Sequence, residues 1–570
     1  MITERVDDIP VLIAELEKSE LSNYLDQYFP DHGNWQGLSG GKVTAGFLTY
    51  LLSCGDHRLN RVEPWVKNRL YTLRHCLDNQ GFTEKDFTDD RIGALLDRYS
   101  DEKQWQIFEQ AHNANMLEIH DLSTKGEAIR LDAMIVQSFR AEGENFKKGH
   151  SKQHRSDLPQ LKAMVATLDP LSMPLHSVIV SGNQADDPLY LKTIAGLNPD
   201  LLAEHQLFVG DVKLASFDNR ASLQQEGYCY LCPLSRKQCS LAQIATYLER
   251  CPTELTVIEE ATTNIAHPAA VKAKAFEIEE QRHCEKLDLT WTERRLVVYS
   301  TAHAESLNRK FDDRLNKSIQ QLNELLIPKQ GKKKIETVAA IEQAVTNLLK
   351  DNKTTPFFTV TISSQVEEIP IRKYGSRPAG IRQQTSFSLQ VEKNVTAIEK
   401  HRQILGWRVY ATNCTPEKMT TKECVLCYRQ EYRIEHKFNE LLNKFTALVP
   451  VYLQKDHRIK TLIRLSLLAL KFVSTIQHQV RKGLEDTGRK IKELYPGNPG
   501  RATAKPTTKM ILEAFQNIDL VILPFDNQTI IKISRLKPVQ VQLLNLLKLK
   551  PKIFTDLEQI SFSGFDLRET

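Results

Sequence analysis

The sequence predicts an α/β fold: a mixed five-stranded sheet, preceded by a helical N-terminal region and interrupted by a long insertion. Two observations lead to this prediction. Between residues 128 and 235, β-branched and apolar runs separated by turn residues follow the order strand, strand, strand, helix, strand, helix, strand. Before residue 118, apolar residues instead recur at the spacing of amphipathic helices, as in 11–29 and 42–53.

The five strands are each expected at a short apolar run, namely IRLDAMIVQSF (129–139), LKAMVATLD (161–169), LHSVIVSG (175–182), LFVG (207–210) and YCYLCPL (228–234). The first three are close in sequence and are predicted to form an antiparallel meander. A helix is expected between the last two strands, in SFDNRASLQQEG. The pattern of the core then stops until GWRVYATN (406–413).

These signals divide the chain into five predicted domains: a helical N-terminal domain (1–118), the first part of the core (119–240), an insertion (241–405), the second part of the core (406–495) and a C-terminal appendage (507–570). A Pro- and Gly-rich linker, 496–506, precedes the appendage. The insertion contains a charged helical stretch (303–326), a basic turn (328–334) and two β-like segments (356–365 and 385–393). The appendage should contain two strands and a helix.

Composition restricts the function less than the motifs do. The 76 basic and 71 acidic residues give a net charge of only +5, so any nucleic-acid partner must be bound by local basic patches. One cluster lies within residues 58–74, although a solvated helix face has the same composition. The strongest apolar run, 462–473, is short and interrupted by Arg464 and Lys471. We therefore expect a cytoplasmic protein without a membrane partner.

Two C-x-x-C pairs, Cys229 with Cys232 and Cys424 with Cys427, raise the question of a zinc site. The first pair lies in a predicted strand, where residues three apart face opposite sides of the sheet. The second pair lies close to or within a predicted helix. Packed, reduced thiols are the favoured interpretation.

A carboxylate triad is the strongest functional signal. Residues 428–445, YRQEYRIEHKFNELLNKF, are predicted to form one helix that places Tyr428, Tyr432 and Glu435 on a shared stripe beside an apolar face. Asp132 lies in the first strand of the core, and Asp211 directly follows the fourth. Carboxylates at strand ends that face a helix carboxylate suit Mg²⁺, which prefers oxygen ligands. Each of these acids, taken alone, is also common as a purely structural residue.

Together with their surroundings, the three acids resemble the DDE transposases of bacterial insertion sequences, in particular the longer members of the large IS-four superfamily. The resemblance extends over most of the chain and is carried by DHRLNRVEPW (56–65), residues 149–169, the turn 182–186, GWRVYATN (406–413) and residues 450–470. The strand order also fits the ribonuclease-H-like core of that family. In the family's acidic helix, an arginine follows the tyrosine by three residues, the glutamate follows by seven, and a lysine comes seven residues after the glutamate. Tyr428 and Glu435 keep the spacing, but Glu431 and Leu442 occupy the arginine and lysine positions.

The resemblance implies an enzyme that binds the terminal inverted repeats of its element, cleaves DNA and joins the freed ends to target DNA. Asp132, Asp211 and Glu435 would be catalytic and would hold two Mg²⁺ or Mn²⁺ ions. Contacts to DNA would come from residues beside these acids: Tyr428, Arg433, Lys437, Lys152, His154 and Arg155. A homodimer on DNA is expected. The alternatives are an inactive or domesticated protein that binds terminal repeats without cutting them, and a metal-dependent nuclease without joining activity.

Overall fold

The structure, a computed structural model, describes residues 1–149, 155–258, 273–327, 335–372, 375, 380–525 and 528–559. The chain divides into two compact units. Unit 1 comprises residues 1–232, 283–291 and 427–570, and unit 2 comprises residues 233–282 and 292–426. The predicted N-terminal domain, the first strands of the core and the appendage therefore share one unit.

The N-terminal part of unit 1 is helical, as predicted. Its helices are α1 (Ile9–Lys18), α2 (Leu21–Tyr28), α3 (Gly40–Cys54), α4 (Val62–Lys67), α5 (Leu70–Cys76), α6 (Asp89–Arg98) and α7 (Glu102–Ile119). Side-chain caps begin several of them: Ser39 accepts from the backbone of Lys42, Thr88 from Arg91 and Asp101 from Gln104. Such caps satisfy backbone N–H groups that have no partner inside the helix.

The five predicted core strands are all present, as β2 (Ala128–Gln137), β3 (Gln160–Leu168), β4 (Met173–Ser181), β5 (Leu207–Gly210) and β6 (Cys229–Pro233). β2, β3 and β4 form the predicted antiparallel meander. β5 pairs in parallel with β2, and β6 pairs in parallel with β5. The helices α8 (Asp187–Ala195) and α9 (Phe217–Gln225) connect β4 to β5 and β5 to β6. The core is thus a mixed sheet, as the sequence indicated.

The predicted number of strands was too small. Among the described residues the sheet has nine strands in the order β4-β3-β2-β5-β6-β12-β9-β8-β7. Three of the additional strands lie between residues 256 and 300, where no strand was predicted: β7 (Thr256–Ile258), β8 (Ala273–Cys284) and β9 (Leu289–Ser300). β8 was missed because its alternation of buried and exposed positions is carried largely by charged side chains. The fourth, β12 (Trp407–Thr412), lies in GWRVYATN, where the pattern of the core was expected to resume.

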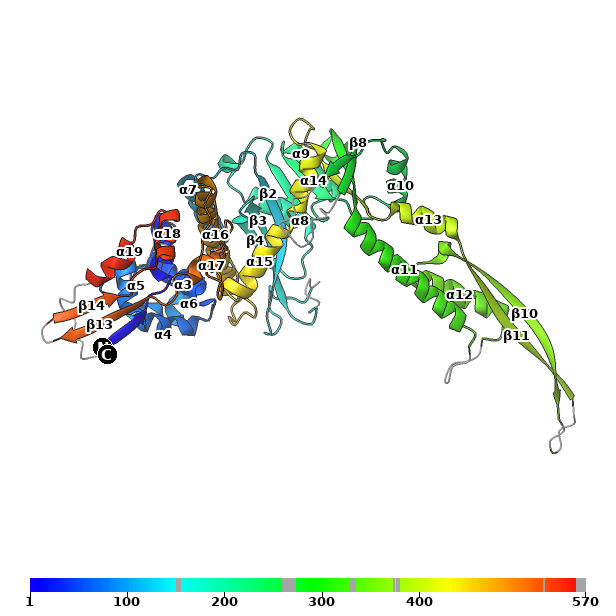
Figure 1. The fold of residues 1–570 in the computed structure, drawn as a ribbon, viewed down its shortest axis with the longest axis horizontal. Helices are drawn as coiled ribbons and strands as arrows, with labels where there is room; N and C mark the ends of the chain where they lie inside the picture. Colours follow the sequence, from blue (N-terminus) through cyan, green and yellow to red (C-terminus); the bar gives the residue numbers. More distant parts are fainter. Residues whose placement is uncertain are drawn as a thin grey trace. The chain divides into compact units, whose positions relative to one another are not determined.

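One long helix, α16 (Asp456–Asp486), lies between the N-terminal helices and the meander in unit 1 (Figure 1). A single hydrophobic core joins α16 to the N-terminal helices, to the strands β2–β4 and to the appendage. The appendage consists of α17 (Thr508–Glu513), β13 (Asp519–Phe525), β14 (Gln528–Ile533), α18 (Pro538–Leu546) and α19 (Lys552–Thr555). Its two strands and its helix α18 confirm the prediction. None of the helices within the described residues is long and apolar enough to cross a membrane.

The first strand of the chain was not predicted. β1 (Ile2–Arg5) pairs antiparallel with β13, so that residues 2–5 lie opposite residues 519–522. Together with β14 they form a three-stranded sheet. The two ends of the described chain are therefore tied to each other by backbone hydrogen bonds.

Unit 2 contains a helical layer and a long hairpin. The helices are α10 (Leu241–Glu249), α11 (Thr301–Glu324), α12 (Val338–Asp351) and α13 (Val395–Ile404), and the hairpin strands are β10 (Phe358–Ile371) and β11 (Gly380–Lys393). A hydrophobic core including Phe311, Leu315, Ile341 and Phe358 joins α11 and α12 to the base of the hairpin. The hairpin continues beyond the helices as a two-stranded ribbon (Figure 1). The helix and both strands match the predicted segments, whereas the basic turn 328–334 lies outside the described residues.

Candidate active site

Two of the predicted acids occupy equivalent positions on neighbouring strands. The parallel register of β2 and β5 pairs Leu131 with Gly210. The residues that follow this pair in the two segments are Asp132 and Asp211. Asp132 is 8% exposed, and Asp211 is half-buried. The sheet therefore brings together two carboxylates that are far apart in sequence.

A tyrosine that the sequence analysis did not single out orients Asp211. The hydroxyl of Tyr190, a buried residue of α8, donates a hydrogen bond to Asp211 Oδ1 at 2.7 Å. The backbone N–H of Lys213 donates to the same oxygen at 2.7 Å. Burial raises the pKa of Tyr190 well above its ordinary value, and the charges of Asp211 and then Asp132 raise it further. Tyr190 stays protonated and can only donate to this carboxylate.

The predicted single helix over 428–445 is wrong. The segment is divided into α14 (Thr421–Arg429), α15 (Tyr432–Glu440) and a π-helical turn (Leu441–Phe445). At the junction, the N–H of Glu431 bonds to the carbonyl of Tyr428 at 3.0 Å, three residues back instead of four. Tyr428 therefore lies in the last turn of α14 and Glu435 in the first turn of α15.

The break has an identifiable cause in Arg130. An unbroken helix would bond the N–H of Glu431 to the carbonyl of Cys427. That carbonyl instead accepts from Arg130 Nη2 at 2.6 Å and from the N–H of Gln430 at 3.1 Å. Arg130 is 1% exposed, and its Nε also donates to Asp169 Oδ2 at 2.7 Å. On β2, Arg130 and Asp132 are two residues apart and face the same side of the sheet.

Arg130 thus anchors the end of α14 to the strand that carries Asp132. The helix after the break, α15, also packs against β2. The position of the acidic segment relative to the two aspartates follows from this contact, because the buried guanidinium has two fixed acceptors on different elements.

Glu431 joins the predicted acids. It is half-buried and accepts a hydrogen bond from the side chain of Tyr428. Burial raises its pKa most, and the charges of Asp132, Asp211 and Glu435 raise it further. The charges of three carboxylates therefore act on a fourth, Glu431, and Glu435 is the exposed member of the group. In the sequence analysis, Glu431 was noted only as a departure from the family pattern. Tyr428, three residues before it, was the available signal that the carboxylate of Glu431 has a hydrogen-bond partner.

The predicted DNA contacts have different environments. Lys437 is only 7% exposed, and its Nζ lies 3.1 Å from Glu440 Oε2, so the assignment of Lys437 to DNA binding is not supported. Burial and then the charge of Asp169 raise the pKa of Glu127, and the charge of Arg433 opposes them, which places Arg433 near Glu127. Arg155 is exposed and forms two 2.9 Å hydrogen bonds with Asp157. Lys152 and His154 lie outside the described residues.

Comparison with known proteins identifies the family. The sequence model of the transposase DDE domain matches residues 124–471, a range that includes Asp132, Asp211, Glu431 and Glu435. The chain belongs to the DDE transposase family.

A more distant likeness is to the cryo-EM structure of the piggyBac transposase synaptic complex with hairpin DNA. The TM-score is 0.24 and the sequence identity 11%, over 60% of this chain and 73% of that chain. No curated protein matched the sequence.

Membership of the family implies that this transposase has a ribonuclease-H-like core and uses divalent metal ions. The four carboxylates fit such ions by donor chemistry, because Mg²⁺ and Mn²⁺ prefer oxygen ligands. The charges of Asp132, Asp211 and Glu435 raise the pKa of Glu431, which shows an accumulation of negative charge that a cation would offset. Over the part of the chain that the structure describes, no three His, Cys, Asp or Glu residues already stand close enough to hold an ion.

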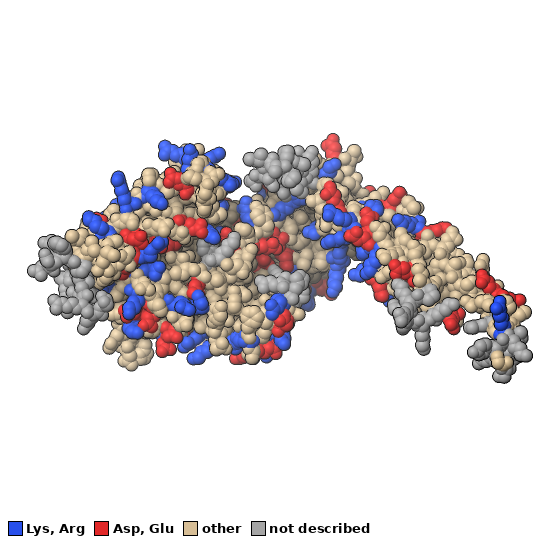
Figure 2. Space-filling model, turned by 60° about the horizontal axis from the view of Figure 1, so that its bottom comes forward, with Lys and Arg blue, Asp and Glu red and all other residues tan. Residues whose placement is uncertain are grey.

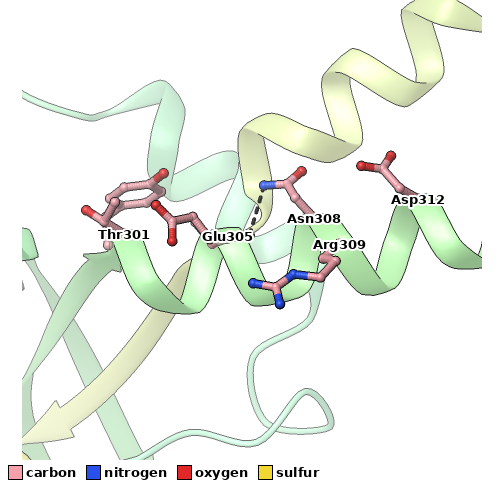
Figure 3. Close-up of a pocket in the computed structure, with 7 residues that line it drawn as sticks. Thr301, Glu305, Asn308, Arg309 and Asp312 are labelled. Atoms are coloured by element: carbon pink, nitrogen blue, oxygen red, sulfur yellow. Dashed lines mark hydrogen bonds between the residues drawn. The ribbon is translucent and has the colours of Figure 1, made fainter.

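A pocket of the transposase lies elsewhere, within unit 2. It has a volume of about 650 Å³ and is lined by the start of α11 and the end of β9: Tyr299, Thr301, Ala304, Glu305, Asn308, Arg309 and Asp312. Figure 3 shows Asn308 bonded back to its own helix, with Glu305, Arg309 and Asp312 following one another along α11. None of the four carboxylates lines this pocket. We assign it no part in the reaction.

The surface agrees with the near-balanced net charge. Figure 2 shows Lys and Arg side chains interleaved with Asp and Glu over the visible face. No single-sign field covers that face, so recognition of DNA must depend on local groups of cations.

Replacing Arg130 should be costly to unit 1. We expect Arg130→Leu to lower the free energy of unfolding by about 3–5 kcal/mol, because it leaves the buried carboxylate of Asp169 without its partner. The double variant Arg130→Leu with Asp169→Leu should recover part of that loss. Urea denaturation followed by circular dichroism measures both. A double variant as unstable as the single one would show that the pair does not act as a unit.

Proposed function

We propose that this chain is an active cut-and-paste transposase of the bacterial IS-four superfamily. In this proposal it binds the terminal inverted repeats of its own insertion sequence, cleaves DNA at their ends and transfers the freed strands to target DNA. The observation that supports it best is the in-register pair Asp132 and Asp211, whose charges, together with that of Glu435, act on Glu431. The family match covers all four residues.

In the proposed mechanism, Asp132, Asp211 and Glu435 would hold two Mg²⁺ or Mn²⁺ ions. When bound, such ions would supply activation of the attacking water or 3′-hydroxyl and stabilisation of the leaving oxygen for displacement at phosphorus. Tyr190 fixes the orientation of Asp211 by donating to Oδ1. Tyr428 does the same for Glu431. Arg130 keeps the acidic segment over β2, so that the carboxylates keep their relative positions during the reaction.

Contacts to DNA in this proposal come from Tyr428, Arg433 and Arg155, together with Lys152 and His154. They would bind phosphates and position the cleaved strand without reading its sequence. Lys437 is not included, because it is buried against Glu440. The helical region 1–118 is the proposed reader of the terminal repeat, and the assembly on DNA is a homodimer with one repeat bound by each subunit.

A second candidate function has one observation in its favour. Glu431 and Leu442 replace the arginine and lysine that the resembled transposases carry on the acidic helix. A protein that had lost cleavage but kept terminal-repeat binding would tolerate both changes. Detection of Mg²⁺-dependent cleavage of a terminal-repeat duplex separates this candidate, and analysis of the products separates a transposase from a nuclease that never joins ends.

The three predicted acids give the first test. Asp132→Asn, Asp211→Asn and Glu435→Gln should each reduce cleavage and strand transfer by more than about 100-fold, because loss of a residue that merely supports a metal ligand already costs 10–100-fold. Binding of the terminal-repeat duplex should stay close to wild type. The matched control is Asp200→Asn, an exposed carboxylate of unit 1 in the turn Pro199–Leu201. Wild-type cleavage by any of the three variants would remove that residue from the site.

Glu431 gives a second test. If its carboxylate shares the bound cations, Glu431→Gln should raise the Mg²⁺ concentration for half-maximal cleavage by about 10-fold or more. Direct titration with Mn²⁺ should show the same loss of affinity in the absence of DNA. Glu417→Gln, at an exposed position in the loop before α14, serves as the control. Unchanged metal affinity would restrict Glu431 to its hydrogen bond with Tyr428.

Assembly gives a third test. Joining of two ends by a homodimer needs two competent subunits in one complex. In an equal mixture of wild type and Asp132→Asn, the two-ended product should therefore fall to about a quarter, the chance that both subunits are wild type. Quantitative gel analysis of strand-transfer products measures this fraction. A fall to about one half would indicate independent monomers.

A further inference from the structure

Cationic side chains from four elements of unit 2 gather around two histidines. This group, here named the Arg236 cluster, consists of Arg236, His303, Lys310, Arg314, His401 and Arg408. Arg236 lies in the turn between β6 and α10, Arg408 lies on β12 and His401 lies on α13. The other three lie on α11 at i, i+7 and i+11 and therefore share one helix face.

Direct hydrogen bonds, as well as electrostatic interactions, connect the members of the cluster to the surrounding elements. Arg408 Nε donates to His303 Nε2 at 3.1 Å, which makes this imidazole nitrogen an acceptor. Arg236 Nη2 donates to the carbonyl of Trp407, the residue before Arg408, at 3.2 Å. The turn before α10 and the strand β12 therefore hold the guanidinium groups of Arg236 and Arg408 near His303, at the start of α11. Arg236, Lys310 and Arg408 are exposed, and Arg314 is half-buried.

The members of the cluster repel one another. Burial lowers the pKa of His303 most, and the charges of Arg408, Arg236 and Lys310 lower it further. The pKa of His401 is lowered by burial and then by the charges of Arg314 and Arg236. Neutral histidines between fixed cations leave the positive charge of the cluster uncompensated.

Some arginines of unit 2 have carboxylate partners. Arg402 is paired with Asp312 at 2.5 Å, and Arg294 with Glu277 at 2.5 Å. Over the described residues, none of Arg236, Lys310, Arg314 and Arg408 forms an ion pair with Asp or Glu. These four cations stand close together, so their charge is available to an anion from outside the chain.

The extent of the cluster favours a polyanion. From His303 to Arg314, α11 rises about 16 Å at about 1.5 Å per residue, which is several times the spacing of phosphates along one DNA strand. The cations extend along α11 and beside its start, and none of them lines the pocket described above, so one small anion would meet only a part of them. A row of phosphates matches the whole face.

We propose that the Arg236 cluster binds the phosphate backbone of duplex DNA without reading its sequence. The inference rests on the proposed function, in which DNA is the substrate. At the acidic segment of unit 1, by comparison, Lys437 is buried and positions 431 and 442 carry Glu and Leu.

The experiment measures DNA binding by the full-length chain as a function of salt. The probe is a fluorescent duplex of arbitrary sequence, and the variant is Arg236→Gln with Arg408→Gln. We expect the slope of log affinity against log salt to become shallower by about two units, at about 0.9 per lost phosphate contact. The control, Arg309→Gln with Arg402→Gln, removes the same charge from the same unit and should keep the wild-type slope.

A variant at an exposed, unbonded position guards against misfolding. Lys310→Gln should lower the slope by about one unit, with a thermal melting curve equal to that of wild type. A wild-type slope in the folded variants would overturn the proposal. Inorganic phosphate that stabilises the wild type but not Arg236→Gln with Arg408→Gln, combined with an unchanged DNA slope, would show a small-anion site and would also overturn it.

The result is separable from the proposed function. Asp132→Asn tests the chemistry and should keep the wild-type salt slope, whereas the cluster variants test binding. A shallower slope in the cluster variants together with absence of cleavage in the wild type would support the cluster and reject the transposase reaction. Mg²⁺-dependent cleavage with an unchanged slope would do the reverse.

Discussion

The active-site region depends on one buried interaction, the contact of Arg130 with Asp169 and with the carbonyl of Cys427. A guanidinium that is 1% exposed must have fixed partners, since an unpaired buried charge is strongly unfavourable. One partner follows β3, and the other ends α14. Through this contact the strand that carries Asp132 determines where the acidic segment begins.

The same contact explains the shape of the acidic segment. By engaging the Cys427 carbonyl, Arg130 removes the acceptor that a continuous helix needs, and the chain tightens at Gln430 and Glu431 before α15 begins. This tightening brings Glu431 into reach of Tyr428 and of the charges of Asp132 and Asp211. The break between α14 and α15 thus places a fourth carboxylate, that of Glu431, at the site.

Charges of the two signs gather at separate places. Carboxylates gather in unit 1 at the proposed metal site, and cations without carboxylate partners gather in the Arg236 cluster of unit 2, the proposed contact to DNA. Elsewhere, pairs such as Arg402 with Asp312 neutralise the surface locally. The near-zero net charge of the chain is therefore compatible with a DNA substrate, because short-range groups act within a Debye length of about 8–10 Å.

The sequence by itself determined the order of β2 to β6, the helices before residue 119 and the hairpin of unit 2, because each depends on a hydrophobic period within a few neighbouring residues. It also selected Asp132 and Asp211 by local strand signals, although only the pairing of β2 with β5 brings them to equivalent positions. Only the tertiary structure decided features that depend on distant partners. β1 is a strand because residues 519–522 lie beside it, α15 starts anew because Arg130 takes a carbonyl 297 residues away, and Lys437 is withdrawn from solvent by packing. Such contacts leave no periodic trace in the sequence, since the partners are set by how separate elements pack and not by the spacing of residues along one of them.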